Sequence, residues 1–200
     1  PTNVVVNEND FSADFNGGKA FLFFLLNGEL ADLNLECNWW GSTASSDIDN
    51  KVIGNVDYAP YIVNGTDDNT SLAGFQPVAN TCTGLGPVKV YSATTFNTSS
   101  FVSSHSIIQA AIEASTTLNG YFIDVEDGTY NERVTITKDD ITIKGPNAGI
   151  NPNTGTRGPE AIVSVPSGIP SGFFLDGVSG ITIDGVEVNA NGELFGIFHG

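Results

Sequence analysis

Short runs of alternating apolar and polar residues dominate the second half of the chain. Four of them begin at residues 121, 141, 161 and 181, and the third position of each holds a branched residue: Ile123, Ile143, Val163 and Ile183. Residues two apart in a β-strand face the same side. The four positions therefore predict an aliphatic column inside the fold, with the four runs stacked as one parallel sheet.

Further β-prone runs lie between these four, at 133–136, 172–175, 186–188 and 195–198. A repeat of about 20 residues that holds two or three short strands is typical of a solenoid, because one such unit cannot bury its apolar face alone. A β-sandwich, with a strand roughly every 8–12 residues, is the competing architecture. The constant interval of the aliphatic column favours an all-β solenoid.

One helix is predicted, within residues 106–115 and directly ahead of the first strand. Ile107, Ile108, Ala111 and Ile112 recur at helical spacing, and Ser104 or Ser106 is available as the N-cap. The open end of a solenoid exposes core and strand edges. We therefore expect this amphipathic helix to cover that end.

The charge of the chain is one-sided, with 23 acids against 7 bases and a net charge of −16. This balance argues against nucleic acid and anionic membranes as partners, because both would repel it. The apolar runs are too short to insert across a membrane. Without any methionine, the sequence resembles a piece of a longer chain.

Residues 71–105 differ in composition from both flanks, since they contain no acid and a single base, Lys89. This shift predicts three parts: 1–70, a connector over 71–105, and 106–200. The connector is too apolar for a solvated linker, and we expect six of its side chains to be half-buried against its neighbours: Phe75, Val88, Val90, Tyr91, Phe96 and Phe101.

The start of the third part resembles a known family. Helix Ile108–Ile112, then Phe122-Ile-Asp-Val-Glu-Asp-Gly-Thr-Tyr-Asn-Glu-Arg-Val134, then Ile141-Thr-Ile-Lys-Gly145 are similar to the opening of a pectin-lyase-like right-handed parallel β-helix. In that resemblance Gly128 permits the turn and Tyr130 covers the edge of the first coil.

The first part resembles the opposite end of the same fold. Leu35-Glu-Cys-Asn-Trp-Trp-Gly41 followed by Gly54-Asn-Val-Asp-Tyr-Ala-Pro60 is similar to the closing motif of many bacterial β-helices. The resemblance implies that Trp39 and Trp40 cover the last coil, although a pair of aromatic faces also suits a sugar. The chain would then contain the end of one β-helix and the beginning of another.

The candidate chemistry is sparse. Asp124, Glu126 and Asp127 are close enough in sequence for paired carboxylates or Ca²⁺ ligands, but outward acids are usually solvated. The bases that a polysaccharide lyase would need are limited to Arg133, Lys138, Lys144 and Arg157, and His105 and His199 have no triad partner at a suitable spacing. Nothing matches the catalytic set of pectin methylesterases, so we expect no enzyme and no catalytic or cofactor-binding residue.

Metal binding is a weaker expectation, confined to two oxygen-rich loops that hold Asp47, Asp49, Asp67 and Asp68. Neither loop has the Gly-centred pattern of an EF-hand. Ca²⁺ is therefore a minor candidate, and no cofactor is expected.

Cys37 and Cys82 are the two cysteines, one beside the Trp pair and one in the connector. An acidic, lysine-poor chain favours a secreted or cell-surface location, where a disulfide persists. A bond and two separate buried thiols are both compatible with the sequence.

These observations predict a structural or adhesive module of a very large extracellular surface or filament protein. It would act as a stiff spacer whose partners are further copies or other surface subunits, with a polysaccharide as a further candidate partner. Two alternatives stay open: a carbohydrate-active enzyme of the esterase or lyase type with its catalytic coils elsewhere, and a carbohydrate-binding β-helix without catalysis.

Overall fold

A computed structural model describes residues 4–13, 25–26, 29–30, 33–52, 56–94, 96–192 and 195–200. The chain forms two compact units, Pro1–Gly86 and Pro87–Gly200, which are described separately. It is all-β, with two short helices among the described residues. No helix in these ranges has the length and apolar character needed to cross a membrane.

The described residues of the first unit form short strands and one helical turn. Its elements are β1 (Val4–Val5), β2 (Leu25–Leu26), β3 (Glu29–Leu30), β4 (Leu33–Asn34), α1 (Ser45–Asp49), β5 (Val56–Asp57), β6 (Tyr61–Ile62) and β7 (Cys82–Gly84). The strands β1, β4 and β5 pair in parallel, whereas β2–β3 and β6–β7 are antiparallel pairs. Helix α1 was not predicted, because its five residues offer a single apolar side chain, Ile48, to the core.

The described residues of the second unit form eleven strands and α2 (Ile108–Glu113). The strands are β8 (Val88–Tyr91), β9 (Phe101–His105), β10 (Phe122–Val125), β11 (Gly128–Tyr130), β12 (Val134–Ile136), β13 (Thr142–Lys144), β14 (Ala161–Ser164), β15 (Ser171–Leu175), β16 (Thr182–Asp184), β17 (Val186–Asn189) and β18 (Phe195–His199).

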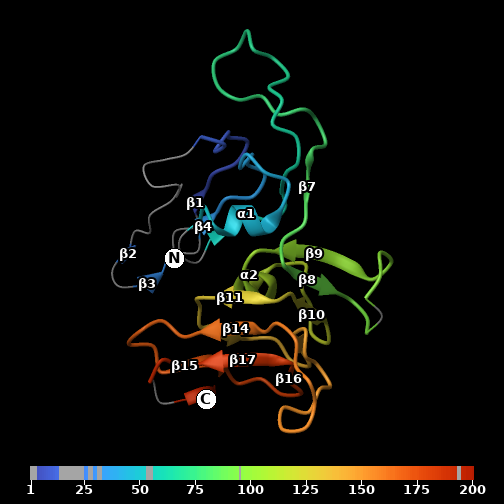
Figure 1. Ribbon diagram of the computed structural model, residues 1–200, viewed down its shortest axis with the longest axis vertical. Coiled ribbons are helices and arrows are strands. Elements are labelled where there is room, and N and C mark those ends of the chain that lie inside the picture. Colours follow the sequence, from blue (N-terminus) through green and yellow to red (C-terminus); the bar gives the residue numbers. More distant parts are fainter. Residues whose placement is uncertain are drawn as a thin grey trace. The chain divides into compact units, whose positions relative to one another are not determined.

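From β10 onward, each sheet takes every third strand. The parallel sets are β10-β13-β16, β11-β14-β17 and β12-β15-β18. Figure 1 shows β11, β14 and β17 lying one below another in chain order. Parallel neighbours need a connection that crosses over, and here that connection contains the two strands of the other sheets.

The aliphatic column is confirmed at three of its four positions. Ile123 lies opposite Ile143, and Ile143 lies opposite Ile183. Val163 is not part of this column: it pairs with Tyr130 and Val188 in another sheet. The prediction of a single sheet from all four runs is therefore wrong for 161–165.

The loop between β13 and β14 explains this error. Residues 145–160 separate these two strands, whereas two residues separate β10 from β11. Asn147 is buried and fixes the loop, because its amide exchanges hydrogen bonds with the N–H of Gly158 (2.8 Å) and the carbonyl of Pro159 (2.9 Å). Because of this long loop, β14 begins 20 residues after the run at 141. It nevertheless joins the sheet of β11 and not the sheet of β10 and β13.

The strands β8 and β9 lie within the predicted connector and extend the sheet of β10 in antiparallel fashion. Val88 and Val90 are fully buried in the second unit's core, and Tyr91 is nearly so. The boundary between the units, after Gly86, falls inside the range 71–105. Residues 71–86 belong to the first unit and 87–105 to the second.

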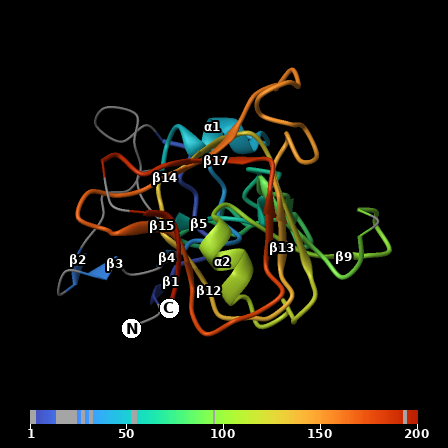
Figure 2. The same cartoon turned by 90° about the horizontal axis from the view of Figure 1, so that it is seen from below.

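Helix α2 buries Ile108, Ala111 and Ile112 in the same core as Ile123 and Val134. Figure 2, which looks along the stack, shows α2 inside the outline that β13, β15 and β17 form in that view, and Figure 1 shows it above β15 and β17. The N-cap is Ile107, without a side-chain hydrogen bond, so the predicted serine cap is wrong. The carboxylate of Glu132 accepts the N–H groups of Ile108 and Gln109 instead, each at 2.8 Å.

Candidate functional site

A disulfide joins Cys37, which follows β4, to Cys82, the first residue of β7 (Cα–Cα 5.2 Å). The bonded alternative is therefore confirmed, and no described cysteine is free. The bond closes a loop of 45 residues in sequence. Loop-closure entropy then contributes about 4 kcal/mol to the stability of the first unit.

The two tryptophans belong to the packing of the first unit. Trp40 has no exposed surface, and its ring lies 5.1 Å from that of Phe11 and 6.2 Å from that of Tyr58. The indole of Trp39 lies against Gly65, where a Cβ would come within 2.2 Å of Nε1. Both rings thus pack against other residues of the first unit.

A cavity of about 660 Å³ adjoins the disulfide within the first unit. Its lining combines apolar groups, among them Phe75, Pro77 and Val78, with the carboxylate of Glu8 and several amides. The residues that line it include no Lys, Arg or His. A neutral or cationic ligand therefore suits this cavity better than an anionic one. Sequence reasoning missed it because residues 7–8 and 75–82 are far apart in the chain.

Three of the four predicted Ca²⁺ candidates accept hydrogen bonds within the first unit. Asp47 accepts a hydrogen bond from Ser42 (2.7 Å), and Asp49 accepts one from the Tyr58 hydroxyl (2.6 Å). Asp67 accepts the N–H of Asn69 in a local turn (3.0 Å). Within the described ranges, none of Asp47, Asp49, Asp67 and Asp68 belongs to a group of metal-ligating side chains.

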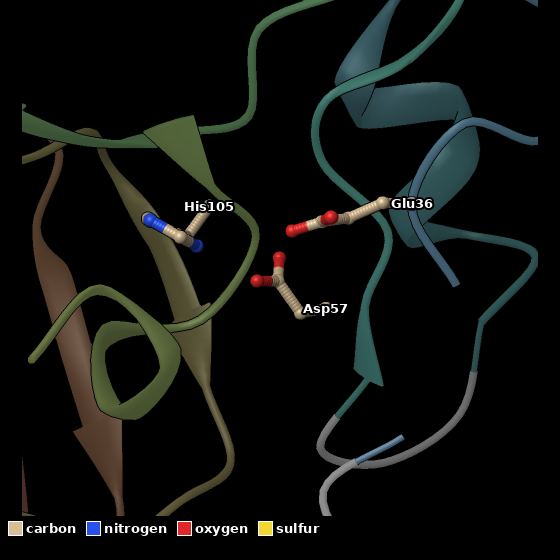
Figure 3. Close-up of side chains that lie close together, drawn as sticks. All are labelled: Glu36, Asp57 and His105. Carbon is tan, nitrogen blue, oxygen red and sulfur yellow. The ribbon is translucent and has the colours of Figure 1, made fainter. Parts of the chain in front are cut away.

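A different pair of carboxylates lies together in the first unit. Glu36 and Asp57 approach within 4.8 Å of one another, and Asp57 is buried at the end of β5 (Figure 3). Figure 3 also draws His105 of the second unit, whose Nε2 lies 3.1 Å from the Ser103 hydroxyl. Two close carboxylates are able to accept a cation. Their separation of 21 positions hid this pair from sequence reasoning.

In the second unit, charged side chains of alternating sign cross the sheet that contains β10. Lys89 lies opposite Asp124, Asp124 opposite Lys144, and Lys144 opposite Asp184. Lys89 also forms an ion pair with Glu126. Opposite charges on facing strands stabilise a sheet. These charges form a ladder across the sheet, and Asp124 and Glu126 of the predicted acidic cluster belong to it or pair with it. Asp127 lies outside it.

Burial is the main cause of a raised pKa at Asp124, and Glu126 adds to it. Lys89 and Lys144 lower the pKa of the same carboxyl. Lys89 and Lys144 thus both favour the charged form of the Asp124 carboxyl, whereas burial opposes it.

The remaining bases of the second unit also have structural partners. The Arg133 guanidinium lies 4.6 Å from the centroid of the Phe174 ring. Arg157 donates to both carboxylate oxygens of Glu160 (2.6 and 2.8 Å), which lowers the pKa of Glu160. Lys138 donates to the carbonyl oxygens of Ile112 and Ala114 at the end of α2.

Glu132 and Gln109 are the important residues that sequence reasoning missed. Glu132 has no exposed surface, and Gln109 is 8% exposed. Their signal was present in the sequence. Glu132 lies two positions before the apolar strand that begins at Val134, and Gln109 lies on a helix of buried isoleucines. A carboxylate and an amide both require hydrogen-bond partners when they are buried.

Comparisons of the chain with protein-family models, with curated proteins and with solved structures found no match. The resemblance to pectin-lyase-like β-helices therefore stays an interpretation of the sequence motifs.

Proposed function

We propose that the second unit is the capped opening of a right-handed parallel β-helix. Successive strands from β10 to β18 join three parallel sheets in turn, so that every third strand belongs to the same sheet. This order supports the proposal. The inward columns also support it, since Ile123, Ile143, Val134 and Phe173 have no exposed surface. Right-handed crossovers are the general rule for parallel connections.

On this basis, we propose that the chain is a structural or adhesive module of a large extracellular surface or filament protein. The register of the inward columns is the observation that carries the proposal. Strands that are bonded edge to edge and share one continuous core resist bending and stretching along the stack. Such a module would act as a stiff spacer between further copies or other surface subunits.

A secreted or cell-surface location is part of this proposal. The Cys37–Cys82 disulfide supports it, since such bonds persist in oxidising compartments. The proposal includes no nucleic-acid partner and no membrane insertion. The net charge of −16 supports this part, because it repels polyanions.

Carbohydrate binding is the second candidate, and the cavity beside the disulfide is the observation that favours it. Its size of about 660 Å³ lies in the range of roughly 300–1,000 Å³ that small ligands occupy. Its mixture of apolar surface and amides matches the two sides of a sugar ring. A carbohydrate-active enzyme of the esterase or lyase type is the third candidate.

The purified chain tests the proposal when it is incubated with polygalacturonate and with methyl-esterified pectin. We expect no new reducing ends, no unsaturated products and no methanol. Release of any of these products by the wild type, and loss of that activity in Asp124→Asn or Arg133→Met, would contradict the spacer function and favour the enzyme candidate. Isothermal titration with neutral trisaccharides, and Phe75→Ala as the variant, tests the binding candidate separately.

A further inference from the structure

One wall of the cavity beside the disulfide is a single stretch of chain. Eight of the twelve residues that line the cavity are consecutive, from Phe75 to Cys82. Near one end of this stretch, the N–H of Asp68 donates to the carbonyl of Gln76 (2.8 Å). At the other end, the disulfide holds Cys82 against Cys37. The wall is therefore the returning arm of a hairpin, and it is fixed at both ends.

Three of the lining residues have an uncommon backbone conformation. Glu8, Cys37 and Asn80 have positive φ angles of 58°, 54° and 62°. Asn tolerates this left-handed region, whereas Glu and Cys have no such preference. Five residues other than glycine adopt it in the described part of the chain, and three of the five line this one cavity. Such residues are concentrated at binding sites, where the surrounding structure holds them in place.

The polar side chains of the cavity offer hydrogen-bond acceptors and no positive charge. Nε2 of Gln76 donates to the Ala73 carbonyl (3.2 Å), which orients the amide. Oε1 of the same amide is buried and has no hydrogen-bond partner among the described residues. A buried acceptor without a donor keeps its desolvation cost. Glu8 contributes the one carboxylate among the twelve lining residues, so a ligand that donates hydrogen bonds fits this lining.

The charge of the first unit favours a cation at this position. Residues 1–86 contain eleven acids and two bases. Two of the acids, Asp67 and Asp68, lie on the outgoing arm of the hairpin, and Asp67 pairs with Pro77 of the cavity wall. The resulting potential attracts cations and repels anions. The apolar part of the lining, which includes Phe75 and Val78, suits the C–H face of a sugar ring.

We propose that this cavity binds an amino sugar, with the protonated amine at the carboxylate of Glu8 and a further N–H or O–H group donating to Oε1 of Gln76. This inference rests on the carbohydrate-binding candidate proposed above and specifies the class of sugar. An ammonium group supplies three donors together with the charge that the first unit attracts. A uronic acid is disfavoured at this site, because its carboxylate would meet that of Glu8.

Isothermal titration of the 200-residue chain with the trisaccharide of glucosamine tests the proposal. The N-acetylated form of the same trisaccharide is the neutral comparison. At low salt, and at a pH at which the amines are protonated, we expect the amine form to bind at least about tenfold more tightly, as a hydrogen bond to a charged group predicts. Added salt should reduce this difference, because the charges are then screened.

Three variants test the residues that the proposal names. Glu8→Gln keeps the size of the side chain and removes its charge, so it should bind the two trisaccharides with equal affinity. Gln76→Leu should weaken both forms by about fivefold, because one acceptor is lost. Asp68→Asn is the matched control, since it removes an exposed acid of the same hairpin that does not line the cavity, and it should keep the preference. The fluorescence of the two tryptophans shows whether the first unit of each variant is folded.

NMR places the ligand, and the amide shifts on titration should be concentrated in residues 75–82 and at Glu8. Shifts confined to β10–β18 would overturn the site, and so would a preference that Asp68→Asn removes as fully as Glu8→Gln. Equal binding of the two trisaccharides by the wild type would overturn the amino sugar while the carbohydrate-binding candidate stands. Binding of neither form would overturn both. The spacer function is judged separately, by the assay for polysaccharide turnover.

Discussion

Glu132 is fully buried, and its two carboxylate oxygens accept hydrogen bonds from two backbone N–H groups of α2. Hydrogen bonds to an ionised group are stronger than neutral ones, and a buried donor left without a partner keeps its desolvation cost. This side chain therefore links a helix of six residues to the strand that follows 21 positions later.

Replacing Glu132 by Ala should lower the free energy of unfolding by about 3 kcal/mol, because two buried N–H groups lose their acceptor. Urea unfolding followed by circular dichroism measures the change. Glu113→Gln is the matched control on the exposed side of α2, since it keeps an acceptor for Nε2 of Gln109, and it should stay within about 0.5 kcal/mol of the wild type. A cost below about 1 kcal/mol for Glu132→Ala would contradict the role assigned to this carboxylate.

Asp124 provides a test of the charge ladder. Its pKa is raised above the ordinary 3.8, first by burial, while Lys89 opposes the rise. NMR titration of its carboxyl should therefore give a value above 3.8, and Lys89→Met should raise it further. The folded protein binds more protons than the unfolded chain between the two values, so this group reduces stability as the pH increases through that interval. A lower pKa in Lys89→Met would show that the ladder is misassigned.

The sequence pattern predicted the strands themselves correctly, but it did not predict which sheet each strand joins. Alternation identified the strands around Ile123, Ile143 and Ile183, because an inward side chain at every second position is a local property. Val163 was assigned to the wrong sheet, because the number of residues in the preceding loop does not determine which sheet the next strand joins. The helix cap was misplaced for a similar reason, since Glu132 lies far along the chain from Ile108.

Gly145 and Gly185 follow β13 and β16 and lie in direct backbone contact. A Cβ on Gly145 would come within 2.3 Å of the Gly185 carbonyl oxygen. Gly145→Ala should therefore cost about 2 kcal/mol or more in unfolding free energy, as overpacking generally does. Gly158→Ala is the control, since its nearest atom is 3.9 Å from the added carbon. Equal stability of the two variants would contradict the close approach of these strand ends.

The molecule as a whole consists of two units with different means of stabilisation. The first unit has the disulfide and a small core around Leu35, Trp40 and Tyr58, whereas the second unit contains no cysteine and has a larger aliphatic core. The composition shift over 71–105 predicted a connector between two parts, whereas the structure divides this range between the two units after Gly86. The candidate sites did not follow from sequence, because the cavity lining and the Glu36–Asp57 pair each combine distant segments.

Reduction of Cys37–Cys82 should weaken the first unit by about 4 kcal/mol and leave the second unchanged. Both tryptophans belong to the first unit, so their fluorescence reports its unfolding, and hydrogen exchange of β10 to β18 reports the second. A loss of protection in β13 or β15 on reduction would show that the two units do not unfold independently.

Engineered disulfides test the stacking of the second unit most directly. Thr142 faces Thr182 across the β13–β16 pair, at a spacing of about 4.8 Å between strands, which a disulfide spans. We predict that the double variant Thr142→Cys, Thr182→Cys forms a bond, detected by mass spectrometry of the non-reduced digest. The double variant Thr142→Cys, Ile162→Cys should form none, because β14 belongs to another sheet. A bond in the second variant but not in the first would show that the runs at 141 and 161 are neighbours in one sheet. That result would contradict the three separate sheets on which the proposed β-helix rests.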